Sequence, residues 1–277
     1  MYFMQNAAIA LFAARNNLPF ALESYNYQMA LARNNPTKYV DGAAIFNEVT
    51  FFDGTESAFY VHSRDTDTAI QITYQKDIYA NYVFTAGGGD IVYGQDPNSD
   101  HSEGNLVWTG AGDDVIYGSV SQDTVYAGDG NDVIRGGDGQ DRMFGGNGNE
   151  LLKGKKGADR LNGGDGDDVL QGGNGNDVLI GGAGRDKLVG GAGDDVFHIG
   201  DTSQKPGQAD VIKDYGRGDD ALRFGEAVST IYVKRDGEDT ILQNGTGADA
   251  EIYAVLKNFT DLLDTYDAYG ITLVDIA

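Results

Sequence analysis

The chain of 277 residues contains no cysteine and only four prolines. Without cysteine, disulfide bridges, thiolate metal sites and cysteine nucleophiles are excluded. The longest apolar run covers only residues 7–14, whereas a membrane-spanning helix needs about 20 apolar residues, so we expect no membrane-spanning segment. Because no Lys or Arg precedes this run, we also expect no N-terminal secretory signal peptide.

Basic residues are scarce. The sequence has 20 Lys and Arg against 43 Asp and Glu, which gives a formal net charge of −23. Nucleic-acid binding requires a basic patch that displaces counterions, so we expect no nucleic-acid partner. An anionic membrane surface is disfavoured for the same reason. The charge instead favours bound cations.

Familiar catalytic motifs are also missing. The sequence contains neither G-x-S-x-G nor H-E-x-x-H, and its three histidines, His62, His101 and His198, are far apart. We expect His62 to be structural and His198 to be exposed, while His101 has acidic neighbours and is an alternative metal ligand. Adjacent carboxylates such as Asp113 and Asp114 suggest a glycosidase, but the repeat described next explains them better.

Glycine is abundant and unevenly distributed, with 30 of the 41 glycines between Gly87 and Gly193. A nine-residue unit repeats ten times in one phase over residues 109–198, as in GGDGDDVLQ from Gly163 and GGNGNDVLI from Gly172. The eighth position is always apolar, and the fourth is glycine except at Ser121. The sixth position is always acidic: Asp114, Asp123, Asp132, Asp141, Glu150, Asp159, Asp168, Asp177, Asp186 and Asp195.

Each repeated position has a physical reason. Glycines permit positive φ angles and therefore a tight turn whose carbonyl groups point one way. One carboxylate per turn adds a charged oxygen, and oxygen ligands without sulfur or histidine suit Ca²⁺ rather than zinc or copper. The last three residues of each unit are expected to form a short strand with one inward apolar side chain. Such strands bury too little alone, so stacked neighbours must build a solenoid core.

This repeat resembles the G-G-x-G-x-D-x-U-x nonapeptide of the RTX family, whose units form a calcium-binding parallel β-roll. The resemblance implies that one coil holds two units and that Ca²⁺ lies between turns stacked two units apart. It places Asp114, Asp132, Glu150, Asp168 and Asp186 in one row of turns and the other five sixth-position residues in a second row. Five turns in each row leave about eight positions for Ca²⁺ in total. Backbone carbonyl ligands are expected at Gly112, Gly130, Gly139, Gly148, Gly166, Gly175, Gly184 and Gly193.

Three turns depart from the pattern. The turn from Gly118 reads GSVSQD and lacks two glycines, and the turn from Gly154 places Lys155 and Lys156 inside the expected binding loop. Both belong to the second row, which we therefore expect to be weaker in its first three gaps and best between the turns from Gly172 and Gly190. Glu150 is one methylene longer than aspartate, which puts its two gaps in doubt.

The fold is expected to be mainly β, a parallel β-roll with a small α+β N-terminal cap and a β-rich C-terminal cap. We divide the chain into residues 1–84, the roll at 85–198 and a C-terminal region at 199–277. The roll begins with a degenerate part at 85–108, in which residues 94–99 look like an insertion. Apolar spacing predicts helices over 4–16 and 20–34, and alternation predicts strands around 59–62 and 70–75.

The C-terminal region is expected to form strands. Residues 230–235 and 239–243 flank an Asp-Gly-Glu turn and predict a β-hairpin, followed by strands at 251–256 and 271–276. Asp210, Asp214 and Asp219 form a candidate for one further Ca²⁺, with exposed loop carboxylates as the alternative. The final residues, ITLVDIA, resemble a type I secretion signal, with an ordinary final strand as the alternative.

These patterns lead to a hypothesis for function. The acidic, glycine-rich repeats would remain unfolded where Ca²⁺ is scarce and fold outside a bacterial cell, after export by type I secretion machinery. The protein would then act as an extracellular or surface-associated structural or adhesive module, binding any surface partner through residues 1–84. The alternatives are an accessory part of a secreted hydrolase and, least favoured, a pore-forming toxin.

Overall fold

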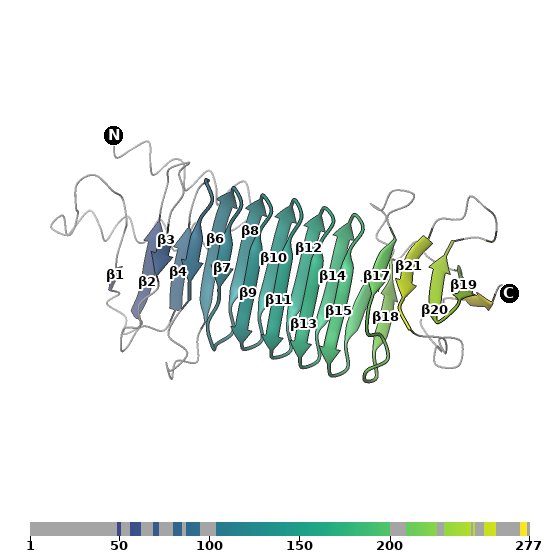
Figure 1. Ribbon diagram of the computed structural model, residues 1–277. Coiled ribbons are helices and arrows are strands. Elements are labelled where there is room, and N and C mark those ends of the chain that lie inside the picture. Colours follow the sequence, from purple (N-terminus) through teal and green to yellow (C-terminus); the bar gives the residue numbers. More distant parts are fainter. Residues whose placement is uncertain are drawn as a thin grey trace.

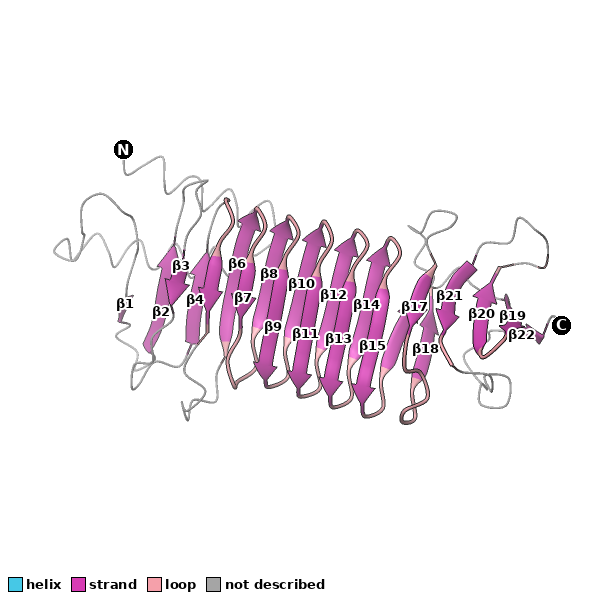
Figure 2. Cartoon of the chain, viewed as in Figure 1, coloured by secondary structure: helices cyan, strands magenta, loops and turns pink. Residues whose placement is uncertain are grey.

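The computed structural model of the chain describes residues 49–50, 56–61, 69–71, 80–84, 87–94, 104–199, 209–225, 230–244, 246, 252–258 and 272–275. The regular elements in this part are all strands, and Figure 2 shows no helix there. The helices expected at 4–16 and 20–34 lie outside the described residues.

The strands form two sheets that face each other along an elongated roll (Figure 1). The first sheet contains, in spatial order, β1 (Val49–Thr50), β2 (Glu56–Val61), β4 (Ala80–Phe84), β6 (Asn105–Ala111), β8 (Thr124–Asp129), β10 (Arg142–Asn147), β12 (Arg160–Asp165), β14 (Val178–Ala183), β16 (Val196–Ile199) and β18 (Ala221–Phe224). The second contains β3 (Ala69–Gln71), β5 (Ile91–Tyr93), β7 (Val115–Tyr117), β9 (Val133–Asp138), β11 (Leu151–Lys156), β13 (Val169–Asn174), β15 (Lys187–Ala192), β17 (Asp210–Ile212), β21 (Ile252–Leu256), β20 (Asp239–Gln243), β19 (Thr230–Asp236) and β22 (Thr272–Asp275).

Within the repeats, the chain alternates between the two sheets, so each strand pairs in parallel with the strand two units away. Met143 of β10 is opposite Leu161 of β12, and Leu152 of β11 is opposite Leu170 of β13. This offset is 18 residues, which confirms that one coil contains two nonapeptides. The parallel β-roll expected for the repeats is therefore the observed fold.

The strands are longer than the three residues expected from the sequence. Most have six residues because the first three residues of the next unit continue the ladder, as Gly146 opposite Gly164 illustrates. Gly164 has a φ of 119°, an extended conformation in the mirror-image region that glycine adopts easily. The second glycine of the unit thus extends the strand before the turn begins.

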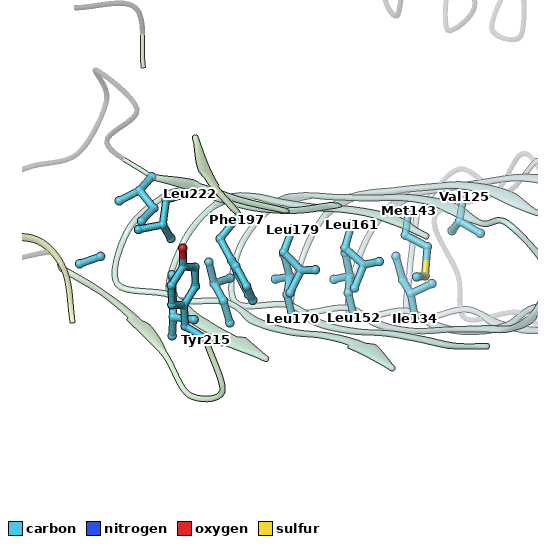
Figure 3. Close-up of a cluster of buried hydrophobic side chains, with 14 of the residues drawn as sticks. Val125, Ile134, Met143, Leu152, Leu161, Leu170, Leu179, Phe197, Tyr215 and Leu222 are labelled. Carbon is cyan, nitrogen blue, oxygen red and sulfur yellow. The ribbon is translucent and has the colours of Figure 1, made fainter. Parts of the chain in front are cut away.

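The core is a single column of apolar side chains between the sheets. The eighth-position residues are fully buried from Ile116 to Phe197. In Figure 3, Leu161 and Leu179 from one sheet face Leu152 and Leu170 from the other. Because each coil contributes only two such side chains, the core depends on the stacking of neighbouring coils.

The two sheets continue on the N-terminal side of the repeats. Val83 of β4 is opposite Val107, and Val92 of β5 is opposite Ile116. Both offsets are 24 residues, six more than in the regular part, which agrees with the insertion expected at 94–99. The strands β2 and β3 stack on β4 and β5, so the roll crosses the boundary expected at residue 84.

The sheets also continue on the C-terminal side. Ile212 of β17 pairs with Leu188, and Leu222 of β18 pairs with Phe197, so both strands add to the roll. The expected β-hairpin is confirmed, with β19 antiparallel to β20 and Gly237 at a φ of 67° in the turn. The strands expected near 251–256 and 271–276 are observed as β21 and β22.

Truncating one core side chain tests the dependence on stacking. Leu170 is fully buried, so Leu170→Ala is expected to lower the free energy of unfolding of the calcium-loaded protein by about 2–5 kcal/mol. Thermal or denaturant unfolding measures this loss. The matched control is Gln171→Ala, because Gln171 is half-buried on the outer face of the same strand and should change stability by less than about 0.5 kcal/mol. Equal effects of the two substitutions would contradict the assigned register.

Candidate metal-binding turns

The acidic turns lie along the two edges of the roll. The first row, with Asp114, Asp132, Glu150, Asp168 and Asp186, joins strands of the first sheet to strands of the second. The second row, with Asp123, Asp141, Asp159, Asp177 and Asp195, joins the second sheet back to the first. All ten side chains are buried, each at most 2% exposed. The structure therefore brings the predicted residues together as two stacked rows.

A hydrogen-bond ladder connects the carboxylates within each row. In the second row, the backbone N–H of Asp141 donates to Oδ1 of Asp159, and that of Asp159 donates to Oδ1 of Asp177, both at 2.8 Å. In the first row, the N–H of Asp168 donates to Oδ1 of Asp186 at the same distance. Each such carboxylate thus receives a donor from the turn one coil earlier.

The second carboxylate oxygen is usually left without a donor. An unpartnered, buried side-chain oxygen occurs at eight sixth positions: Asp114, Asp132, Asp141, Glu150, Asp159, Asp168, Asp177 and Asp186. A buried carboxylate oxygen without a donor is costly unless a proton or a cation compensates it. Ca²⁺ prefers oxygen ligands, so these carboxylates fit a calcium ion.

The burial of these carboxyl groups changes their acidity. Loss of hydration raises the pKa of Asp132 and Asp177 from 3.8 to about 7, and that of Asp141 to about 8. Glu150 is raised to a pKa of about 9 by burial and by its closeness to Asp168. In the metal-free roll, these four carboxyl groups therefore resist ionisation near neutral pH.

The fourth-position glycines are required where successive turns approach each other. Gly166 has a φ of 145°, and a Cβ atom there would collide with the carbonyl oxygen of Gly148. The carbonyl of one turn thus lies against the matching glycine of the next coil.

Among the described residues, no three acidic or histidine side chains gather as a metal cluster. Since Ca²⁺ takes six to eight oxygens, backbone carbonyls would have to supplement the carboxylates.

The fifth position carries a second ladder that the sequence analysis missed. Along the first row, the side chains of Asp113, Asn131, Asn149 and Asp167 each accept the backbone N–H of the fifth residue one coil later, at 2.7–3.0 Å. The frequent Asn or Asp at this position was the available signal. In the second row the fifth position begins with Gln122, Gln140 and Ala158, and such bonds begin only at Asn176.

The turn from Gly118 differs from the others as expected. Here Ser119 and Ser121 replace two glycines, and neither has a positive φ. The preceding strand β7 has only three residues. Asp123 is fully buried, but it is not among the carboxylates with an unpartnered oxygen. Burial raises its pKa to about 6, and hydrogen bonds from Asn105 and Ser119 offset part of this effect.

The two lysines of the Gly154 turn lie outside the row. Lys155 occupies a glycine position with a φ of 84°, and both Lys155 and Lys156 are exposed. Lys156 Nζ pairs with Asp138 Oδ2 of the neighbouring turn at 2.8 Å. Asp159 retains an unpartnered oxygen, so neither lysine bonds to the carboxylate of this turn.

Acidic residues beyond the repeats extend the rows. Asp90 donates its N–H to Asp114 Oδ1 at 2.7 Å, and Asp210 accepts the N–H of Asp186 at 3.1 Å. In the second row, Asp220 Oδ1 accepts the N–H of Asp195 at 2.9 Å. The segment Ala-Asp-Val-Ile at 209–212 repeats the Asn-Asp-Val-Ile of 131–134, which was the overlooked signal.

The three candidate carboxylates of the C-terminal region bond to different residues of the last two repeats. Asp210 bonds to Asp186, whereas Asp214 accepts the N–H groups of Gly190 and Gly191 at 3.0 and 2.9 Å. Asp219 donates its N–H to the side chain of Asp194 at 3.0 Å. Their contacts are those of residues that complete the last repeat turns.

Of the histidines, only His198 is described, at the ninth position of the last repeat. It is half-buried rather than exposed as expected, and burial and nearby Arg160 and Arg223 lower its pKa. His62 and His101 lie outside the described residues. In the part of the chain that the structure covers, no helix has the length and hydropathy required to span a membrane.

Comparison with protein families identifies a calcium-binding repeat in this chain. The model of the RTX calcium-binding nonapeptide repeat (4 copies) matches residues 108–143, 144–179 and 171–201. These spans coincide with the regular coils and their turns. A search of curated proteins found no match to the chain.

The raised pKa values predict a pH dependence of opposite sign without and with calcium. In chelator, the folded roll binds more protons than the unfolded chain, so its stability should rise as pH falls from about 8 toward 4. Calcium must displace these protons. As the pH falls below the pKa of the carboxyl groups, the half-saturating Ca²⁺ concentration should therefore rise about tenfold per pH unit for each displaced proton. Circular dichroism in chelator and calcium titrations at about pH 6 and 8 measure both trends. A calcium affinity independent of pH would contradict the assignment of these carboxylates.

Proposed function

We propose that calcium completes the fold of this chain by binding between the stacked acidic turns of its RTX calcium-binding repeats. The sixth-position carboxylates from Asp114 to Asp195, except Asp123, whose two oxygens already accept hydrogen bonds, supply the charged ligands, and carbonyls of the fourth-position glycines supply neutral ones. When bound, the ion contributes two positive charges beside oxygens that otherwise lack a partner. The observation that carries this proposal is the set of eight buried carboxylates with an unpartnered oxygen.

The number of ions follows from the two rows. Five turns in each row leave about eight gaps, and calcium in a gap would be shared by two coils. We propose that the gap between Asp177 and Asp195 is the best of the second row. Its turns have glycine at the first, second and fourth positions, and Asn176 accepts the N–H of Asp194 at 3.1 Å.

Calcium would also control where the protein folds. Residues 85–198 carry 20 acidic and 8 basic residues, so without Ca²⁺ the repeats repel one another. A ligand that binds only the folded form stabilises it by mass action. RTX repeat proteins are typically secreted bacterial proteins, and we propose that this chain leaves the cell unfolded through a type I secretion system and folds in extracellular Ca²⁺.

Outside the cell, we propose that the folded roll serves as a structural or adhesive module, with residues 1–84 contacting its surface partner. The continuous stack of coils supports this role, because it forms an elongated support for a contact surface at one end. Release of the protein from producing cells by a calcium chelator, but not by a magnesium salt, would support this role. Equal recovery from cells under both conditions would contradict it.

A calcium titration of the full chain, followed by far-UV circular dichroism, tests the proposed folding switch. We expect a cooperative gain of β signal with Ca²⁺ and none with Mg²⁺, because Mg²⁺ demands a smaller octahedral site and gives up its water reluctantly. The control is the same titration after addition of excess chelator, which should reverse the gain. An unchanged β signal in chelator and in millimolar Ca²⁺ would show that the turns do not govern folding.

A further inference from the structure

The carboxylate of Asp123 is surrounded by hydrogen-bond donors from the protein itself. Its Oδ1 accepts the backbone N–H of Asn105 at 2.5 Å and the Asn105 side-chain amide at 2.9 Å. Its Oδ2 accepts the backbone N–H of Ser119 at 2.5 Å, and the Ser119 hydroxyl lies 3.1 Å away. Asp123, Asn105 and Ser119 are all buried, at 0%, 4% and 7% exposure.

Asp177 provides the comparison within the same row. It is as buried as Asp123, and its Oδ1 likewise accepts the N–H of the preceding turn, from Asp159 at 2.8 Å. Its Oδ2, however, has no hydrogen-bond partner. The same residue type at the same repeat position is thus fully bonded in one turn and open to a cation in another.

The difference originates in the backbone of the Gly118 turn. In a regular unit, the second glycine continues the strand at a positive φ, as Gly173 does at 124°. Ser119 does not adopt a positive φ, and β7 ends at Tyr117. The N–H of Ser119 consequently turns toward Asp123 of its own turn. The Ser119 hydroxyl also accepts the N–H of Ser121 at 3.1 Å, which closes the loop on itself.

We propose that the Gly118 turn is a metal-free turn, in which Ser119 and Asn105 replace the calcium ion that the other turns of the row require. The inference rests on the proposed calcium binding between turns, and it specifies one turn that binds no ion. Four donors directed at one carboxylate compensate its charge, since hydrogen bonds to an ionised acceptor are among the strongest in proteins. The second row would therefore hold one ion fewer than its five turns permit.

Counting the ions bound to the full chain tests this inference. Native mass spectrometry in saturating Ca²⁺ would compare the parent protein with Asp123→Asn and with the matched control Asp177→Asn. We expect Asp123→Asn to retain the full number of ions and Asp177→Asn to lose at least one. The double variant Ser119→Gly/Ser121→Gly restores the GGVGQD pattern and should gain one ion. Circular dichroism confirms that each variant remains folded.

The outcomes separate this inference from the calcium proposal. Loss of an ion in Asp123→Asn, or an unchanged count in the double glycine variant, would overturn the metal-free turn while leaving the calcium rows intact. No loss in Asp177→Asn would instead overturn the assignment of the sixth-position carboxylates. If Asp123→Asn failed to fold, the double glycine variant would still decide the question, because it leaves the carboxylate in place.

Discussion

Compensation of buried negative charge is the constraint on which the rest of this structure depends. Ten acidic side chains are buried along the edges of the roll, and eight of them have an oxygen that no donor reaches. The apolar core cannot offset this cost alone, because each coil of 18 residues adds only two fully buried apolar side chains at its eighth positions. Under the proposed binding, calcium would supply the missing charge at the place where two coils meet, and ion binding and stacking would become one event.

The two rows meet this constraint in different ways. The first row carries a continuous outer ladder from Asp113 to Arg185, which supports its turns independently of any ion. The second row lacks such bonds over its first three turns and instead contains the self-bonded Gly118 turn and the exposed Lys155. At its far end, Asp214 and Asp220 accept N–H groups of the last repeat. Of the eight carboxylates with an unpartnered oxygen, five therefore lie in the first row and three, Asp141, Asp159 and Asp177, in the middle of the second.

The repeat made much of the architecture predictable. Its eighth position indicated the core and its sixth position the acidic turns, whereas the stacking offset of two units and the two rows were implied by the resemblance to RTX repeats. Two features could not be predicted from the sequence. The length of the strands depends on how Gly164 and its equivalents extend them. The hydrogen bonding of the Asp123 carboxylate depends on Asn105, which lies 18 residues away in the sequence. The C-terminal coil at Asp210 was missed because a change of spacing separates it from the repeats.

Hydrogen exchange of the full chain, resolved by peptide and followed with and without Ca²⁺, tests the central claim most directly. Amides of the ladders, such as those of Asp141, Asp159 and Asp168, are hydrogen-bonded only when coils stack. The account predicts that these amides exchange rapidly in chelator and become protected when Ca²⁺ is added. Equal protection under both conditions would contradict it, because the rows would then be stable without a compensating cation.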